Sequence, residues 1–191
     1  IFELINLNLS MYKILCLLTF MFLGSTLTAQ IWMSKNAQIR FFSTTPIEDI
    51  EALNNYAAGA INAKTGRIFF KAMMKSFKFE KALMQEHFNE NYVESDQYPT
   101  AEFDGIIQNL PDLSQDGSHE VIVKGQLSLH GTKFSREIKA SLTIKNGKIE
   151  TKTIFLVACH EHNIKIPSVT RKNISDQIEV TIKASFIPKP I

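Results

Sequence analysis

Apolar and polar residues alternate with a period of two along several segments in the second half of the chain. The clearest of these segments run over residues 121–129, 138–145 and 178–186. Successive side chains of a strand point to opposite faces, so strict alternation predicts strands with one buried and one solvated face. Asn146-Gly147 supplies the positive φ angles of a two-residue hairpin turn. We therefore expect residues 138–145 and 148–157 to pair antiparallel.

The first half of the chain repeats this pattern less cleanly. Further strands are expected over four segments, residues 37–43, 56–62, 67–74 and 100–108, and further tight turns at Thr65-Gly66, Asp116-Gly117 and His130-Gly131. The total is about eight strands in roughly 160 residues, a common size for an up-and-down barrel wide enough for one small ligand. The predicted fold class is all-β with one short helix, an eight-stranded antiparallel barrel. A sandwich with a closed core is the competing architecture.

One segment breaks the β pattern. Residues 80–88 (EKALMQEHF) are rich in helix formers and contain neither Gly nor Pro. Leu83, Met84, His87 and Phe88 share one face of such a helix. This stripe either caps the barrel as part of an ordinary core or closes the mouth of a cavity, where flexible methionine and aromatic side chains suit an apolar guest.

The N-terminal segment has the parts of a secretory signal peptide. Lys13 precedes an uncharged apolar run over residues 14–23, and small residues lead to Ala29. We expect residues 11–29 to be removed after Ala29, residues 1–10 to be an upstream over-extension, and residues 30–191 to form one domain in the bacterial periplasm or outside the cell. The apolar run is shorter than the roughly 20 residues that span a bilayer, so we expect no stable membrane anchor in the mature chain. Leu15 before Cys16 argues against lipid attachment at that cysteine.

The charge and the cysteine content of the chain limit the classes of partner and of covalent cross-link that we expect. The formal net charge is +2, with basic and acidic residues mixed along the chain, so no basic face for nucleic acid is indicated. After removal of residues 1–29 only Cys159 remains as a thiol, which excludes an intramolecular disulfide.

The chain lacks the strong sequence signatures of catalysis. It contains no GxSxG, HExxH, P-loop or dinucleotide-binding glycine pattern. The most suggestive cluster is Cys159-His160-Glu161-His162: in an extended conformation the two histidines would share a face and could bind one metal. Two ligands do not make a site, and the cluster also fits a strand end that enters a loop. We expect no catalytic residue, no metal and no cofactor.

Two motifs together resemble the YceI-like family. Residues 79–88 and 98–103 (FEKALMQEHF and YPTAEF) look like its helix followed by a "YPxAxF" strand start. Residues 123–133 (VKGQLSLHGTK) are similar to its "xGxLTLHGVTK" hairpin, with Ser128 for the usual threonine and a different sequence at 132–134. Residues 163–168 resemble the loop before its last strand. The resemblance runs from Gly66 to Phe186 in matching order.

This resemblance implies an extended lipocalin-like barrel, exported to the periplasm or beyond, that encloses a polyisoprenoid such as a quinone or prenyl lipid. No catalytic residues carry over, and neither the ligand nor the oligomeric state follows. Phe69 and Phe70 compete for the inward face of residues 67–74, and Lys71 and Lys75 favour the odd positions as the ones that face water. The residues expected to line the cavity are Phe70, Met74, Leu83, Met84, Phe88, Phe103, Leu127, Leu129, Leu142 and Phe155.

Two alternatives stay open. One is a non-catalytic structural or interaction module of the envelope, whose barrel interior is filled by its own side chains. The other is a metal-dependent enzyme that uses His160 and His162.

Overall fold

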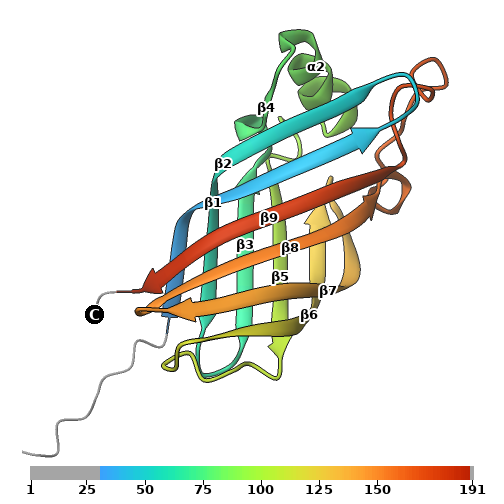
Figure 1. The fold of residues 1–191 in the computed structure, drawn as a ribbon. Coiled ribbons are helices and arrows are strands. Elements are labelled where there is room, and N and C mark those ends of the chain that lie inside the picture. Colours follow the sequence, from blue (N-terminus) through green and yellow to red (C-terminus); the bar gives the residue numbers. More distant parts are fainter. Residues whose placement is uncertain (1–30, 190–191) are drawn as a thin grey trace, which may run out of the picture.

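Eight long antiparallel strands close into a barrel in the computed structural model, which describes residues 31–189 (Figure 1). The strands are β1 (Ile31–Thr44), β2 (Asp49–Asn62), β3 (Arg67–Met73), β5 (Thr100–Gln108), β6 (Gly117–Leu129), β7 (Thr132–Lys145), β8 (Lys148–Ala158) and β9 (Gln177–Pro188). Neighbours in sequence are neighbours in the sheet, and β1 closes the ring by pairing with both β9 and β2. The short strand β4 (Lys78–Phe79) adds to β2 outside this ring. The predicted barrel is confirmed and is complete within these residues; the predicted signal peptide and upstream segment lie outside them.

The alternation seen in the second half of the sequence sets the two faces of the barrel wall. Ile138, Ala140, Leu142 and Ile144 of β7 are all buried. The turn at Asn146-Gly147 has positive φ angles of 51° and 68° and pairs Lys145 with Lys148. This is the predicted hairpin, because two residues with φ > 0 match the twist of the flanking strands.

The reversal between β5 and β6 differs from the expectation at Asp116-Gly117. The positive φ angle lies at Asn109, and the chain then crosses a longer loop before β6 begins at Gly117. The Asp116 carboxylate accepts a hydrogen bond from the backbone N–H of Asn146 at 3.1 Å. Asp116 therefore ties this loop to the neighbouring hairpin and does not form a tight turn of its own.

Strands β1 and β2 are longer than their alternation predicts because both are irregular. The β1–β2 register shifts on either side of Ala37, and the bend of β1 is visible in Figure 1. Such bulges bend a strand and displace its side-chain alternation. Asn54 is fully buried in β2. Its amide donates to the Met73 carbonyl at 3.1 Å and accepts from the Tyr56 N–H at 2.8 Å, so a polar side chain occupies an inward position without an unmet hydrogen bond.

One end of the barrel is filled by side chains. Phe186, Ile61, Leu142 and Ile149 are almost completely buried. Ile149 and Phe186 are direct cross-strand partners next to the β7–β8 hairpin. Closely packed large residues at this end form a floor beneath the rest of the interior.

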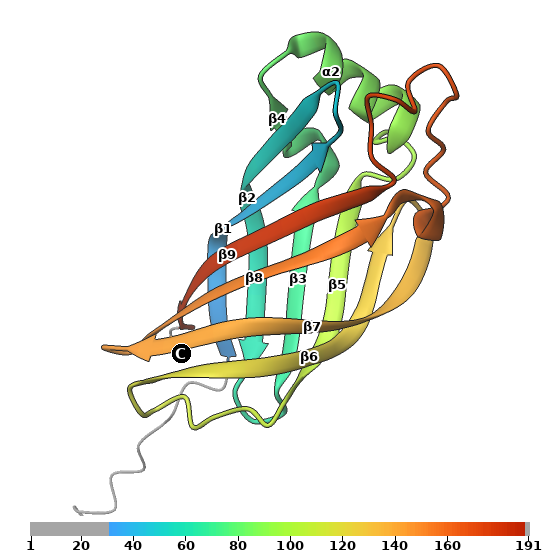
Figure 2. The same cartoon turned by 45° about the vertical axis from the view of Figure 1, so that its right-hand side comes forward.

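The opposite end is covered by two segments that lie outside the barrel wall. The first runs through the 3₁₀ turn η1 (Met74–Ser76), β4, the helix α2 (Ala82–His87) and the π turn η2 (Phe88–Tyr92). The second is the connection between β8 and β9, which starts with the 3₁₀ turn η3 (Cys159–His162). Figure 2 shows both segments at the same end of the barrel, and the Tyr92 hydroxyl donates to the Thr170 hydroxyl at 3.3 Å between them. The predicted helix over 80–88 is present but shorter.

Candidate functional site

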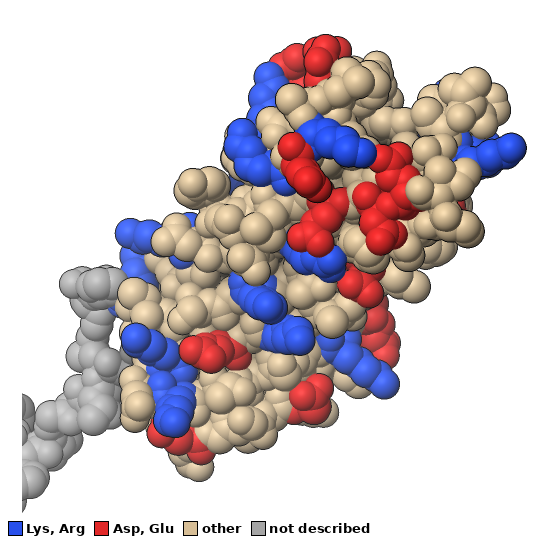
Figure 3. All heavy atoms as spheres, turned by 45° about the horizontal axis from the view of Figure 1, so that its top comes forward, with Lys and Arg blue, Asp and Glu red and all other residues tan. Residues whose placement is uncertain are grey.

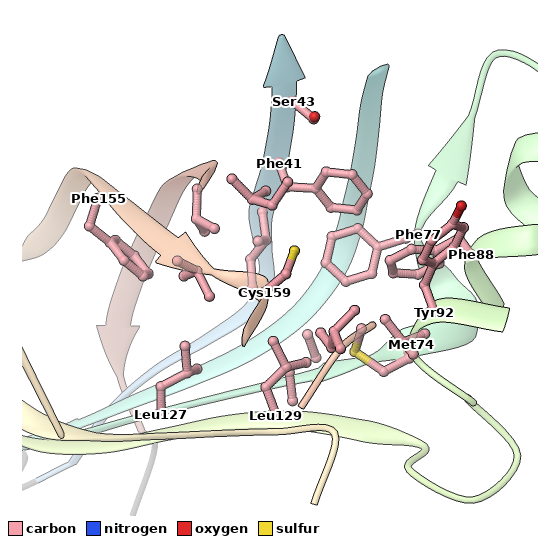
Figure 4. A pocket seen from close by; sticks show the side chains of 18 of the residues that line it. Phe41, Ser43, Met74, Phe77, Phe88, Tyr92, Leu127, Leu129, Phe155 and Cys159 are labelled. Carbon is pink, nitrogen blue, oxygen red and sulfur yellow. The ribbon is translucent and has the colours of Figure 1, made fainter. Parts of the chain in front are cut away.

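An apolar cavity of about 430 Å³ lies between the filled end of the barrel and the two covering segments. Inward side chains of the strands form its wall, and Figure 4 shows Phe41 of β1, Phe155 of β8, and Leu127 and Leu129 of β6 converging on one space. This volume falls within the range of about 300–1,000 Å³ that small-molecule pockets occupy. The barrel is therefore filled at one end and hollow at the other.

Eight of the ten residues expected at the cavity lie in its wall. They are Phe70, Met74, Met84, Phe88, Phe103, Leu127, Leu129 and Phe155. Phe70 is buried and faces inward, so the even positions of β3 form its inner face, as Lys71 and Lys75 indicate. Contact of these side chains with a ligand stays a prediction.

Two expected residues lie elsewhere. Leu83 is 61% exposed, because α2 turns Met84 and Phe88 toward the barrel and leaves Leu83 on its outer side. Leu142 faces inward as its alternation predicts, but it lies in the packed end, below the cavity. Alternation gives the face on which a residue lies and carries no information on how far along the barrel the interior stays open.

A cluster of four phenylalanines lines the cavity beneath α2. Phe41 of β1 packs against Phe77, Phe79 and Phe88, with ring centroids 5.3–5.6 Å apart. Phe79 and Phe88 are 5.0 Å apart. Of the four, sequence reasoning found only Phe88. Phe79 lies in the two-residue strand β4 and Phe77 lies just before it, so neither belongs to a segment with an extended period. Phe41 is followed by a second phenylalanine, so the sequence does not show which of the two faces inward.

The deeper part of the cavity stays open because glycines let aromatic rings lie against the wall. A Cβ atom on Gly59 would lie 2.8 Å from the Phe70 ring. Gly105 and Gly125 are cross-strand partners, and a Cβ on either would lie 2.8 Å or less from the Phe103 ring. Larger side chains at these positions would push the rings toward the lumen.

Polar contacts join the elements around the cavity mouth. Glu48, in the turn between β1 and β2, accepts hydrogen bonds from the Lys81 ammonium at 3.0 Å and from the Asn173 amide at 3.2 Å. These two contacts lower the pKa of Glu48 below its usual value. Together with the Tyr92–Thr170 hydrogen bond, Glu48 links both covering segments to the barrel.

The cluster Cys159-His160-Glu161-His162 does not adopt the extended conformation in which its histidines would share a face. It forms the turn η3, and Asn163 ends this turn in the left-handed conformation. His160 donates to Asp176 at 2.6 Å on the exposed surface, Glu161 pairs with Arg136, and His162 is fully buried. Within residues 31–189, no three His, Cys, Asp or Glu side chains are grouped so that they could hold a metal ion.

Cys159 is the member of this cluster that reaches the cavity. Its side chain is buried and lines the cavity (Figure 4). Burial, and to a smaller extent the negative charge of Asp176, raises the pKa of its thiol to about 11. The thiol is therefore protonated near neutral pH and is a poor nucleophile.

Comparisons with known proteins agree with this architecture. A solved polyisoprenoid binding domain from Saccharophagus degradans, implicated in plant cell wall breakdown, superimposes with a TM-score of 0.72 at 12% identity, over 85% of this chain and 100% of that one. Burkholderia cenocepacia BcnA gives 0.66 at 12% identity, over 78% and 95% of the two chains. The Campylobacter jejuni YCEI protein gives 0.53 at 13% identity, over 68% and 78%.

Three further findings concern the chain. No curated protein matches the chain. In the part of the chain that the structure describes, no helix is long and apolar enough to cross a membrane. The model of the YceI-like domain matches residues 33–186, which include nearly all of the barrel, and the chain therefore belongs to the YceI-like family.

Proposed function

We propose that this protein is an exported lipid-binding protein that encloses the apolar chain of a polyisoprenoid, such as a quinone or prenyl lipid, in its barrel. The observation that carries this proposal is the apolar cavity of about 430 Å³. An interior filled by its own side chains would suit a structural or interaction module, and here only one end of the barrel is filled.

The distribution of polar groups favours a long hydrocarbon with its head group at the mouth. Thr151 and Thr153 lie in the wall, but their hydroxyls donate to carbonyls of β7 at 2.8 and 2.7 Å. Polar side chains with a position near the mouth include Glu48, Tyr92 and Asn173. Burial of each methylene contributes about 0.8 kcal/mol, so several isoprene units support tight binding without a polar contact to the chain.

The solved relatives support the same class of ligand. The domain from Saccharophagus degradans is described as polyisoprenoid binding, and it shares this fold over its whole length. The protonated Cys159 and the divergent side chains of η3 favour a binding role over a catalytic one.

The experiment that tests the proposal is mass spectrometry of organic extracts from residues 30–191, purified without detergent from a bacterial periplasm. We expect a stoichiometric isoprenoid. Leu129→Asp, which puts a charge into the cavity wall, should lose the lipid, whereas Leu156→Asp on the outer face of β8 should keep it. A folded wild-type protein without lipid that also fails to take up added quinone would refute the proposal.

A further inference from the structure

Large apolar side chains project into solvent around the cavity mouth. Ile47 in the β1–β2 turn is 62% exposed, Leu83 on α2 is 61% exposed and Val169 in the β8–β9 connection is 84% exposed. These residues belong to three segments that are separate in the sequence, and Glu48 links the same three segments through Lys81 and Asn173. The rim of the mouth therefore carries three exposed apolar side chains, here called the apolar tips. They lie on three segments that the hydrogen bonds of Glu48 join.

Basic side chains gather on one side of this rim. Lys165, Arg171 and Lys172 line a shallow groove between the β8–β9 connection and the β1–β2 turn, together with Ile47. Among residues 31–189, none of these three basic side chains forms an ion pair. The acidic residue of this groove, Asp176, is paired with His160.

The acidic side chains at this groove and beside it, Asp176 and Glu48, are both paired. In Figure 3 basic atoms occupy the right-hand extremity of the molecule, acidic atoms lie inward of them, and atoms of both charges lie at the top. Glu48 is one of the rim carboxylates and is paired with Lys81. The α2 side carries Glu80, Glu86 and Glu90 together with Lys78 and Lys81. The side of the rim that carries Ile47 and Val169 therefore presents three basic side chains without an ion pair among the described residues, Lys165, Arg171 and Lys172.

The groove and the cavity share a wall. Ile164, Ile166 and Ile174 of the β8–β9 connection line both of them. A surface that engages the outer side of this connection therefore touches the same segment that borders the apolar interior.

We propose that this rim docks on a lipid bilayer that contains anionic phospholipids. Val169 and Ile47 enter the boundary between head groups and acyl chains, and Lys165, Arg171 and Lys172 contact lipid phosphates. Apolar tips beside basic side chains are the combination that binds such a surface. This inference rests on the proposed function, because a membrane is the source of a lipid ligand that is insoluble in water.

The experiment is co-sedimentation of residues 30–191, which contain the complete barrel, with vesicles of phosphatidylethanolamine and phosphatidylglycerol at a ratio of 7:3. Each basic residue near an anionic surface contributes about a fivefold gain in partitioning, so the triple variant Lys165→Gln, Arg171→Gln, Lys172→Gln should bind about 100-fold more weakly. Its matched control is Lys148→Gln, Lys152→Gln, Lys183→Gln on β8 and β9, which should bind like the wild type.

The apolar tips are tested in the same way. Val169→Ser combined with Ile47→Ser should weaken vesicle binding, whereas Ile154→Ser, which removes a 52% exposed isoleucine from the outer face of β8, should not. Melting temperatures close to that of the wild type show that the variants are folded.

Wild-type protein that stays in solution with these vesicles at low salt, or a triple variant that sediments like the wild type, would overturn docking. A separate assay follows quinone uptake from dilute detergent. Rim variants that lose vesicle binding and keep this uptake support the inference. A wild type that binds vesicles and takes up no quinone would leave docking in place and refute the proposed function instead.

Discussion

The Cys159 thiol provides a direct test of the cavity wall. Its pKa is about 11, against 9.0 for an unperturbed thiol. The thiolate is the reactive species, so at pH 8 the folded protein should present about 100-fold less of it than an unfolded chain does. Cys159 is the only cysteine in residues 30–191, and every labelling event in this segment therefore reports on the cavity.

The assay is the reaction of residues 30–191 with a disulfide reagent at pH 8, compared with the same protein in denaturant. We expect labelling of the folded protein to be slower by about two orders of magnitude. Its rate should rise tenfold per pH unit up to about pH 11. An isoprenoid in the cavity should slow the reaction further, in proportion to the fraction of protein that carries ligand, because Cys159 lies in the wall.

The same shift predicts a loss of stability at alkaline pH. The unfolded chain releases the thiol proton near pH 9 and the folded protein near pH 11, so stability is fully present below pH 9 and falls as the pH rises through 11. The loss should be about 2–3 kcal/mol and should vanish in Cys159→Ser. Labelling of the folded protein within a few-fold of the denatured rate, or an alkaline profile that Cys159→Ser leaves unchanged, would refute the description of this wall.

Three further changes test the cavity, its cover and a buried histidine. Gly59→Ala should displace the Phe70 ring toward the lumen and destabilise the barrel by about 1–3 kcal/mol. Thermal melting and the amount of extractable lipid measure both effects, and unchanged lipid content would contradict the displacement. Tyr92→Phe removes the hydrogen bond to Thr170 between the two covering segments, so ligand release should be faster by up to about tenfold. Stopped-flow transfer of a fluorescent prenyl ligand measures this rate, and an unchanged rate would show that the hydrogen bond does not hold the cover. His162 is buried with its pKa lowered, chiefly by desolvation, from 6.5. Its contribution to stability is therefore present above pH 6.5 and lost as the pH falls through its folded pKa, and unfolding by urea at pH 7 and pH 5 should show a smaller pH effect in His162→Phe.

The parts of the fold that the sequence predicts best are those where one interaction dominates. In β7 and β9 the burial of one face determines every second residue. At Asn146-Gly147 the backbone has positive φ angles, which Asn and Gly adopt more readily than other residues. The buried face of strand β2 is harder to predict from the sequence, because Asn54 faces inward and its neighbour Asn55 interrupts the alternation. Only its tertiary partner, the Met73 carbonyl, explains why this amide is buried.

The sequence predicts which apolar residues face the interior of the barrel, but not how much of this interior is hollow. Inward positions such as Phe103 and Leu127 follow from alternation. The division between the filled end and the hollow end depends on ring orientation over glycines, as at Gly59 and Phe70, which is a property of packing across strands. The cluster at Cys159 is a turn because the chain reverses there toward the β8–β9 connection, and no local pattern signals that choice.

The closure of the barrel by β1 also constrains how the protein folds. Phe42 pairs with Glu179, so the last seam joins strands that are more than a hundred residues apart in the chain. Contacts of such long range make folding slow, commonly milliseconds to seconds, since the entropy of closing the loop must be overcome before the contacts form. Ring closure has to wait until β9 has been synthesised. A chain that lacks either terminal strand would expose two unpaired edges that invite aggregation, and it would not settle into a smaller barrel.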